Sequence, residues 1–242
     1  MKSNFHTIFG KKMWLMLISI VIVLVIGLFI YYKLMIGSNR TQYVIKFLRE
    51  PYSYQDLIIS AGSRCDESVF EFPSTGMVGF IWDDSFRPGH RHQGIDIFSG
   101  TKPGETAVFA AYDGYLTRLP EWKSSLIIRI PNDPINNKQQ IWIYYTHLAD
   151  ANGNSFINEE FPPGTYEIPI NSGDLLGYQG NYSGKVGSPV GVHLHFSVVK
   201  DDGTGKFLNE LDFNNTLDPS AYFNLDLNAN VNPDLLPLCG EN

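Results

Sequence analysis

Five side chains in three short strings of this sequence have the types and spacing needed for metal-assisted hydrolysis. HQGID contains His92 and Asp96, YTHL contains His147, and GVHLHF contains His193 and His195. Imidazole nitrogens and carboxylate oxygens are the ligands that a catalytic zinc ion takes, with one coordination position left open for water. Four of the six histidines of the chain lie in these strings, each beside glycine or aromatic residues. Chance placement explains this poorly, and the sequence predicts a Zn2+-dependent hydrolase.

A strand is the element expected to position two of the imidazoles. Alternate residues of a β-strand share a face, so His193 and His195 are expected to point the same way. Leu194 and Phe196 would then point to the other side and hold the strand in the core. Such anchoring supplies the rigidity that ligand geometry requires.

His92 and Asp96 are four residues apart, a spacing that would suit one face of a helix. Gly94 and the β-branched residues Ile95 and Ile97 disfavour a helix. A loop that enters a strand is predicted instead. Gly94 would let the backbone turn sharply, so that the imidazole and the carboxylate converge on one ion.

His147 follows the aromatic run of residues 141–145, which is predicted to be a strand. Taken alone, it is better explained as a strand-ending histidine that bonds to a nearby tyrosine. Its occurrence together with the other two strings is what makes it a candidate catalytic residue.

The rest of the chain indicates a mainly β fold. Short β-branched and aromatic runs separated by turn residues follow from about residue 70, and no amphipathic segment of helical length lies between them to make parallel crossovers. We therefore expect an antiparallel β-sheet domain over residues 70–226, a juxtamembrane stalk or a preface to the domain over residues 37–69 with a short helix at 41–50, and a C-terminal strap over residues 227–242. The predicted strands are residues 77–82, 107–111, 115–118, 125–130, 140–146, 175–178 and 192–199.

Residues 13–32 carry no charge, and about 20 helical residues at about 1.5 Å each match a hydrocarbon core of about 30 Å. The sequence predicts a leader over residues 1–12 and a transmembrane anchor over residues 13–36, which makes the lipid bilayer a partner. A cleaved signal peptide is the alternative, but the apolar run is long for one and no small-x-small cleavage site follows it. Positive charges on the two sides nearly balance, so they leave the orientation open.

The net charge and the cysteine content limit the possible partners and the cellular compartment of the chain. The net charge of −7 provides no basic surface, so nucleic acid is not expected as a partner. Cys65 and Cys239 are the only cysteines and flank the region that holds the candidate ligands. A disulfide between them is one interpretation and would place the domain in an oxidising compartment, whereas two buried free thiols are the other.

The motifs resemble those of the lysostaphin-type, or LytM-type, zinc metallopeptidases, which cut peptide cross-links of bacterial peptidoglycan. The resemblance covers roughly residues 76–200 and rests on HQGID, VFAAYDG, YTHL, GDLLG and GVHLHFSV. It implies a sandwich-like metallopeptidase domain in which His92, Asp96 and His195 bind Zn2+ and His147 and His193 are uncoordinated catalytic histidines. No site residue of the family pattern is missing.

The resemblance also implies a substrate and a location. Peptide stems or cross-bridges of peptidoglycan lie outside the cytoplasmic membrane, so the catalytic domain is expected outside the cytoplasm and residues 1–12 inside. A non-catalytic scaffold or activator of other wall hydrolases, and a metallopeptidase that acts on a surface protein, remain as alternatives. The scissile bond stays open, as does which of His147 and His193 is the general base.

Overall fold

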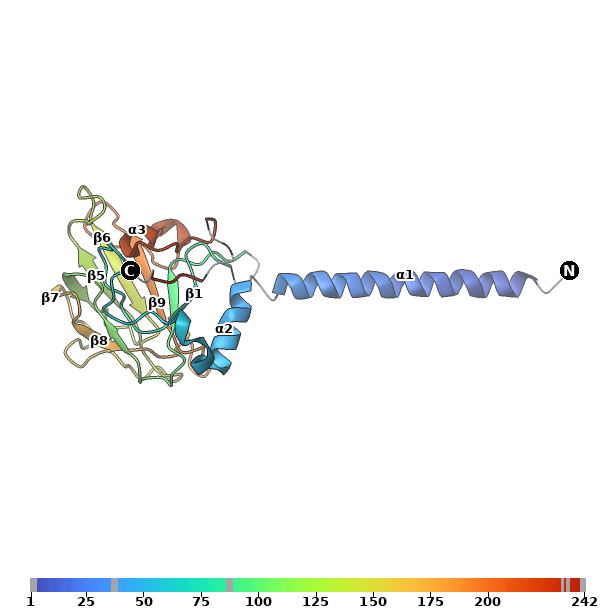
Figure 1. Ribbon diagram of the computed structural model, residues 1–242, viewed down its shortest axis with the longest axis horizontal. Helices are drawn as coiled ribbons and strands as arrows, with labels where there is room; N and C mark the ends of the chain where they lie inside the picture. Colours follow the sequence, from blue (N-terminus) through green and yellow to red (C-terminus); the bar gives the residue numbers. More distant parts are fainter. Residues whose placement is uncertain (1–3, 36–38, 86–88, 232, 234–235, 240–242) are drawn as a thin grey trace.

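The computed structural model describes residues 4–35, 39–85, 89–231, 233 and 236–239, and shows a long N-terminal helix followed by a β domain (Figure 1). Helix α1 (Asn4–Met35) contains the segment Lys11–Tyr31, which has a mean hydropathy of 3.0 and no buried part. By length and composition this segment could cross a membrane, a test that an N-terminal signal sequence also passes. Residues 1–3 of the predicted leader and residue 36 of the predicted anchor lie outside the described residues.

Helix α2 (Asn39–Arg49) packs on the β domain. Its Val44 and Phe47 are buried in one cluster with Met77 and Phe98. The observed helix agrees closely with the helix predicted over residues 41–50. It ends before a proline, because a proline disfavours helical backbone at the residue that precedes it.

Antiparallel pairing organises the domain into two sheets. The larger sheet has the strand order β1-β2-β9-β6-β5-β4-β7, with β10 paired to β9, and the smaller sheet pairs β3 with β8. The strands of the larger sheet are β1 (Met77–Phe80), β2 (Ile95–Phe98), β4 (Gly114–Thr117), β5 (Leu126–Ile130), β6 (Ile141–Thr146), β7 (Ile168–Ile170), β9 (Leu194–Lys200) and β10 (Thr216–Leu217). Those of the smaller sheet are β3 (Ala107–Phe109) and β8 (Leu175–Tyr178).

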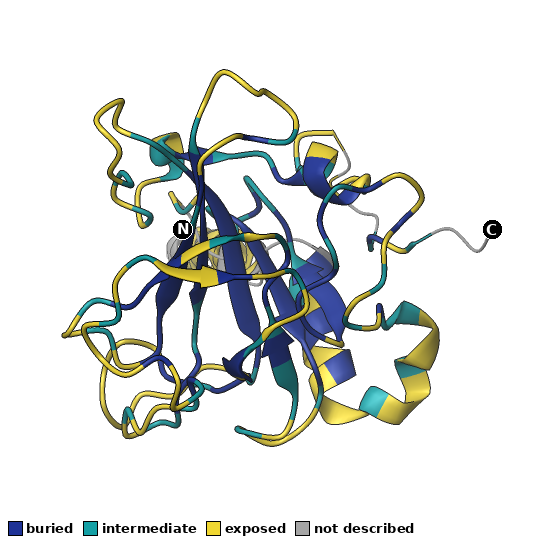
Figure 2. Ribbon diagram, turned by 90° about the vertical axis from the view of Figure 1, so that its left-hand side faces the viewer, coloured by how far each residue is buried: buried dark blue, intermediate teal, exposed yellow. Residues whose placement is uncertain are grey.

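The core lies between the two sheets. One cluster of buried side chains includes Val108 and Leu176 of the small sheet together with Ile143, Tyr145 and Phe196 of the large sheet. The central strands are buried along almost their whole length, as the dark ribbons in Figure 2 show. Burial on both faces makes β2, β6 and β9 a rigid platform for any side chain at their ends.

The predicted mainly β fold with one N-terminal apolar helix is confirmed. Each strand predicted from the sequence has an observed counterpart, and β2 begins at Ile95, where a loop was expected to enter a strand. The sequence analysis did not identify β7 and β10. Strand β7 has three residues with a proline in the middle, which suits only a sheet edge, and β10 has two residues, so neither carries a readable alternation.

The C-terminal segment returns to the domain through backbone pairing and a disulfide. Trp82 donates its backbone N–H to Leu227 O at 2.9 Å, and Ala229 donates its N–H to Trp82 O at 2.9 Å. A disulfide joins Cys65 to Cys239, with their Cα atoms 5.0 Å apart and a sequence separation of 174. The remaining helical elements are η1 (Pro51–Leu57), η2 (Phe213–Asn215) and α3 (Ser220–Phe223).

Candidate active site

Two of the candidate metal ligands lie on adjacent strands in the middle of the large sheet. Asp96 of β2 pairs directly with His195 of β9 in the antiparallel register. Asp96 Oδ1 lies 2.8 Å from His195 Nδ1, and both residues are largely buried. His195 therefore presents Nδ1, not Nε2, to the carboxylate.

His92 reaches the same point from the loop before β2. Its backbone N–H donates to Asp84 O at 2.8 Å, and its Nδ1 lies 3.0 Å from Ile81 O. Because a carbonyl oxygen only accepts, Nδ1 carries the proton and Nε2 keeps its lone pair. His92 Nε2 lies 3.1 Å from Asp96 Oδ1 and 3.1 Å from His195 Nδ1. The backbone of the loop thus fixes which nitrogen faces the other two ligands.

The three atoms form a small triangle of the kind that holds a metal ion. Within the described part of the chain, His92, Asp96 and His195 are the one group of three or more such residues whose ligand atoms all lie within 4.8 Å of one another. A triangle with edges of 2.8–3.1 Å leaves room for an ion about 2.1 Å from each atom, the distance at which zinc binds nitrogen and oxygen ligands. The donor set, two imidazoles and one carboxylate, also suits zinc.

Charge around the triangle favours an ionised carboxylate. Burial by itself would raise the pKa of Asp96, but the neighbouring His92 and His193 outweigh it and hold this pKa well below its usual range. Burial opposes the charged form of His92, yet the Asp96 carboxylate raises the pKa of His92 overall. Burial lowers the pKa of His195. The Asp96 carboxylate therefore stays ionised at neutral pH and is available to a cation.

His193 lies beside the triangle without belonging to it. Its Nδ1 is 2.7 Å from Gly191 O, so Nδ1 is the protonated nitrogen. Its Nε2 lies 3.7 Å from Asp96 Oδ1. The imidazole stacks on Phe98 with ring centroids 4.9 Å apart and an angle of 24° between the planes. His193 and His195 both lie close to Asp96, although β9 begins only at Leu194 and His193 therefore precedes the strand.

His147 faces His193 from the end of β6. Their ring centroids are 4.3 Å apart, and the ring of His147 lies 6.3 Å from that of His195. The backbone of His147 has a φ of 70°, and its Nδ1 lies 2.6 Å from Tyr182 O. Burial, reinforced by His193 and His195, lowers the pKa of His147 to about 3. His147 is therefore neutral at physiological pH and keeps an unprotonated Nε2.

The structure places all five candidate residues together. It also shows backbone carbonyls at the site that the sequence analysis missed. Each of His92, His147 and His193 is oriented by a backbone carbonyl, and no pattern of side chains in the sequence predicts which carbonyl does so.

Gly94 has a different role from the sharp turn that we expected. It does not adopt a positive φ, but a Cβ at this position would lie 2.0 Å from Phe196 O. Glycine is needed because the loop approaches the β9 backbone so closely.

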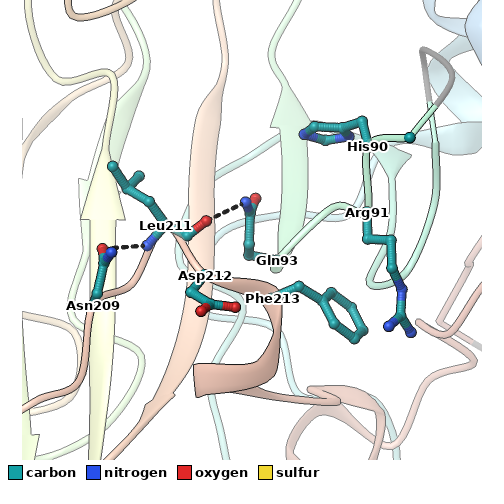
Figure 3. A pocket seen from close by; sticks show the side chains of 8 residues that line it. His90, Arg91, Gln93, Asn209, Leu211, Asp212 and Phe213 are labelled. Carbon is teal, nitrogen blue, oxygen red and sulfur yellow. Dashed lines mark hydrogen bonds between the residues drawn. The ribbon is translucent and has the colours of Figure 1, made fainter.

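An open groove of about 470 Å³ lies beside the loop that carries His92, between residues 89–93 and residues 209–213 (Figure 3). Gln93 Nε2 donates to Leu211 O at 2.8 Å across it. The guanidinium of Arg91 lies 3.6 Å from the centre of the Phe213 ring. These contacts connect residues 89–93 to residues 209–213.

Comparison with known proteins gives matches among solved structures only. No protein-family model matches the chain, and no curated protein matches it. The chain is similar to a glycyl-glycine endopeptidase LytM from Ruminococcus gnavus, with 24% identity, a TM-score of 0.36, and coverage of 53% of this chain and 44% of that one. It therefore spans less than half of that protein.

Two further solved structures are similar at lower identity. The antimicrobial peptidase lysostaphin from Staphylococcus simulans has 15% identity and a TM-score of 0.38, with 68% of this chain and 54% of that one covered. A variant of the catalytic domain of the prophage-encoded M23 protein EnpA from Enterococcus faecalis has 17% identity and a TM-score of 0.37, with 63% and 97% covered. The solved structures similar to this chain thus include LytM, lysostaphin and another M23 protein, the group that its motifs resemble.

Proposed function

We propose that this chain is a membrane-anchored, zinc-dependent endopeptidase that hydrolyses peptide cross-links of bacterial peptidoglycan. The observation that supports it most is the convergence of His92, Asp96 and His195, with His147 and His193 beside them and outside the triangle. Three ligands plus uncoordinated imidazoles is the composition of a catalytic rather than a structural zinc site. The matching motifs point to wall peptides as the substrate.

The proposed ligands are His92 Nε2, Asp96 Oδ1 and His195 Nδ1. When bound there, zinc supplies a Lewis acid that polarises the scissile carbonyl and makes water more acidic. Two neutral imidazoles and one carboxylate leave a net charge near +1 at the site. One hydrogen bond and one strand pairing keep this geometry: Ile81 O fixes the ring of His92, and the β2–β9 register holds Asp96 against His195.

The two remaining histidines, His147 and His193, are suited to the proton transfers of hydrolysis. Both hold their Nδ1 proton against a backbone carbonyl, so each presents an unprotonated Nε2 and can accept a proton before it donates one. Hydrolysis of an amide needs one proton taken from water and one delivered to the leaving amine. One imidazole can carry out both transfers in turn, taking the proton of water on Nε2 and delivering the same proton to the leaving amine.

The N-terminal helix and the disulfide support a location for this chain. We infer that α1 is a single-pass anchor and that the β domain lies outside the cytoplasm, where peptidoglycan is found. The bond between Cys65 and Cys239 fits this placement, because disulfides persist in oxidising compartments.

The experiment that tests the function uses the full chain in detergent micelles with purified peptidoglycan of several cross-bridge types. Released amino groups and the masses of the fragments would identify the bond that is cut, and metal content would be measured on the same preparation. We expect cleavage with about one zinc per chain, abolished in Asp96→Asn. Stoichiometric zinc without cleavage of any wall would favour the scaffold, and cleavage of surface proteins alone would favour the other alternative.

A further inference from the structure

We propose that helix α2 is a positioning element of the active site and that Leu48 is the residue through which it holds His193. The inference rests on the proposed function for its activity readout. Helix α2 lies on the side of the β domain from which α1 leaves (Figure 1), and only residues 36–38 separate the two helices. Three contacts connect α2 to the residues that orient the site.

The first contact is with the aromatic ring beneath His193. Phe98 stacks on the His193 imidazole at 4.9 Å. The same ring shares a buried cluster with Val44 and Phe47 of α2. Helix α2 therefore limits the movement of the surface on which His193 rests.

The second contact is with the carbonyl that fixes the proton of His193. Gly191 O lies 2.7 Å from His193 Nδ1. A Cβ on Gly191 would lie 3.1 Å from Leu48 Cδ1 and 3.5 Å from Phe98 Cε1, so both side chains lie close to Gly191. Leu48 is 37% exposed. Its removal would cost little core packing but would free the Gly191 peptide.

The third contact reaches the opposite side of the site. Arg40 Nε lies 3.6 Å from Asp84 Oδ2, and both side chains are buried. Asp84 O accepts the backbone N–H of His92 at 2.8 Å, and Asp84 N–H donates to Ile81 O at 3.1 Å. Ile81 O is also the acceptor for His92 Nδ1. Helix α2 thus contacts the side chain of Asp84, whose backbone bonds to the proposed ligand His92, and lies close to Gly191, whose carbonyl orients His193.

Two glycines allow this packing. A Cβ on Gly79 of β1 would lie 2.5 Å from Val44 Cγ2, and a Cβ on Gly100 would lie 2.5 Å from Pro51 Cβ. Helix α2 and the residues after it therefore lie directly on the backbone of the domain. The catalytic unit would then include α2, and the segment after α1 would be a preface to the domain.

The test compares Leu48→Ala with Ile45→Ala in the full chain in detergent micelles. Ile45 is 43% exposed on the outer face of α2 and is the matched control. We expect Leu48→Ala to lower kcat about 10-fold or more with KM and metal stoichiometry unchanged, because small displacements of a catalytic group are costly. Nitrogen-15 spectra of the histidine rings should show a loss of the single Nδ1-protonated form of His193. Ile45→Ala should change none of these.

A second pair of variants tests the contact between Leu48 and Gly191 by changing Gly191. Gly191→Ala introduces a Cβ against Leu48 and should lower kcat, and adding Leu48→Ala should restore part of it because the leucine methyl groups are gone. If Leu48→Ala does not fold, Leu48→Val, which lacks the Cδ atom that contacts Gly191, replaces it and should lower kcat in the same way.

An unchanged kcat and an unchanged His193 spectrum in Leu48→Ala would overturn the proposal, as would additive effects in the Gly191 pair. Equal losses in the Ile45 control would also overturn it. If the wild type cleaves no wall peptide, the proposed function fails. The spectra of His193 would still decide whether α2 positions this residue.

Discussion

Asp96 and His195 lie directly opposite one another on β2 and β9, and their Oδ1 and Nδ1 atoms are 2.8 Å apart. Both strands are buried on both faces, so neither side chain can move without disturbing the sheet. The third ligand, His92, joins them from a loop whose backbone fixes the imidazole. A metal site built in this way is largely preformed.

Removing the carboxylate should empty the site. We expect Asp96→Asn to weaken zinc binding by more than the roughly 10- to 100-fold that loss of an outer hydrogen-bond partner costs, because a ligand and its charge both disappear. Metal content after dialysis measures this. Glu160→Gln, at an exposed position, is the control and should keep its zinc. Full zinc content in Asp96→Asn would contradict the ligand assignment.

His147 should matter for turnover and not for metal. We expect His147→Asn to retain zinc and to lose about 100-fold or more in kcat, the usual effect of losing a base or an oxyanion partner. Asparagine is chosen because the φ of 70° at this position is tolerated better by asparagine than by alanine. Metal content and turnover on the same sample provide the measurement. A zinc-free variant would show that His147 is a ligand.

Metal affinity should fall as the pH falls. A proton and the metal compete for His92 Nε2, and the pKa of His92 is raised above its ordinary value of 6.5 by Asp96 against the effect of burial. The loss should therefore begin above 6.5, while Asp96 stays ionised until well below 3.8. Competition with a chelator from about pH 8 to about pH 5 measures it. Constant affinity across that range would show that His92 does not contribute a ligand.

Gly94 should not accept a side chain. A Cβ there would lie 2.0 Å from Phe196 O and 2.8 Å from Ser197 Cβ, so Gly94→Ala must push the loop away from β9. We expect destabilisation of about 1–3 kcal/mol or more, together with weaker zinc binding because His92 and Asp96 flank this residue. Urea unfolding and metal titration measure the two effects. Gly27→Ala, whose Cβ would have nothing within 4 Å, is the control.

The disulfide should contribute to stability and not to catalysis. Cys65 and Cys239 close a segment with a sequence separation of 174, and removal of such a bond typically costs about 2–5 kcal/mol. We expect Cys239→Ser to unfold at a lower denaturant concentration while its zinc content stays the same. The wild type under reducing conditions should behave like the variant. Equal stability of the oxidised wild type and Cys239→Ser would show that the bond contributes nothing.

The sequence by itself determined the chemical inventory and the class of fold. Short β-branched and aromatic runs predicted the strands because alternation is a local property of a half-buried strand. The uncharged run of residues 13–32 predicted the apolar helix because length and composition decide that property. His92, Asp96, His147, His193 and His195 could be selected because they are few and occur in three strings.

Only the tertiary structure decided how these residues meet. Asp96 lies opposite His195 because of the register of β2 against β9, and long-range packing sets that register. The nitrogen that each imidazole presents depends on backbone carbonyls such as Ile81 O and Tyr182 O, which no sequence pattern reveals. The burial of α2 against the domain depends likewise on contacts between residues distant in sequence, so a local reading of residues 37–69 could identify the helix but not what it holds in place.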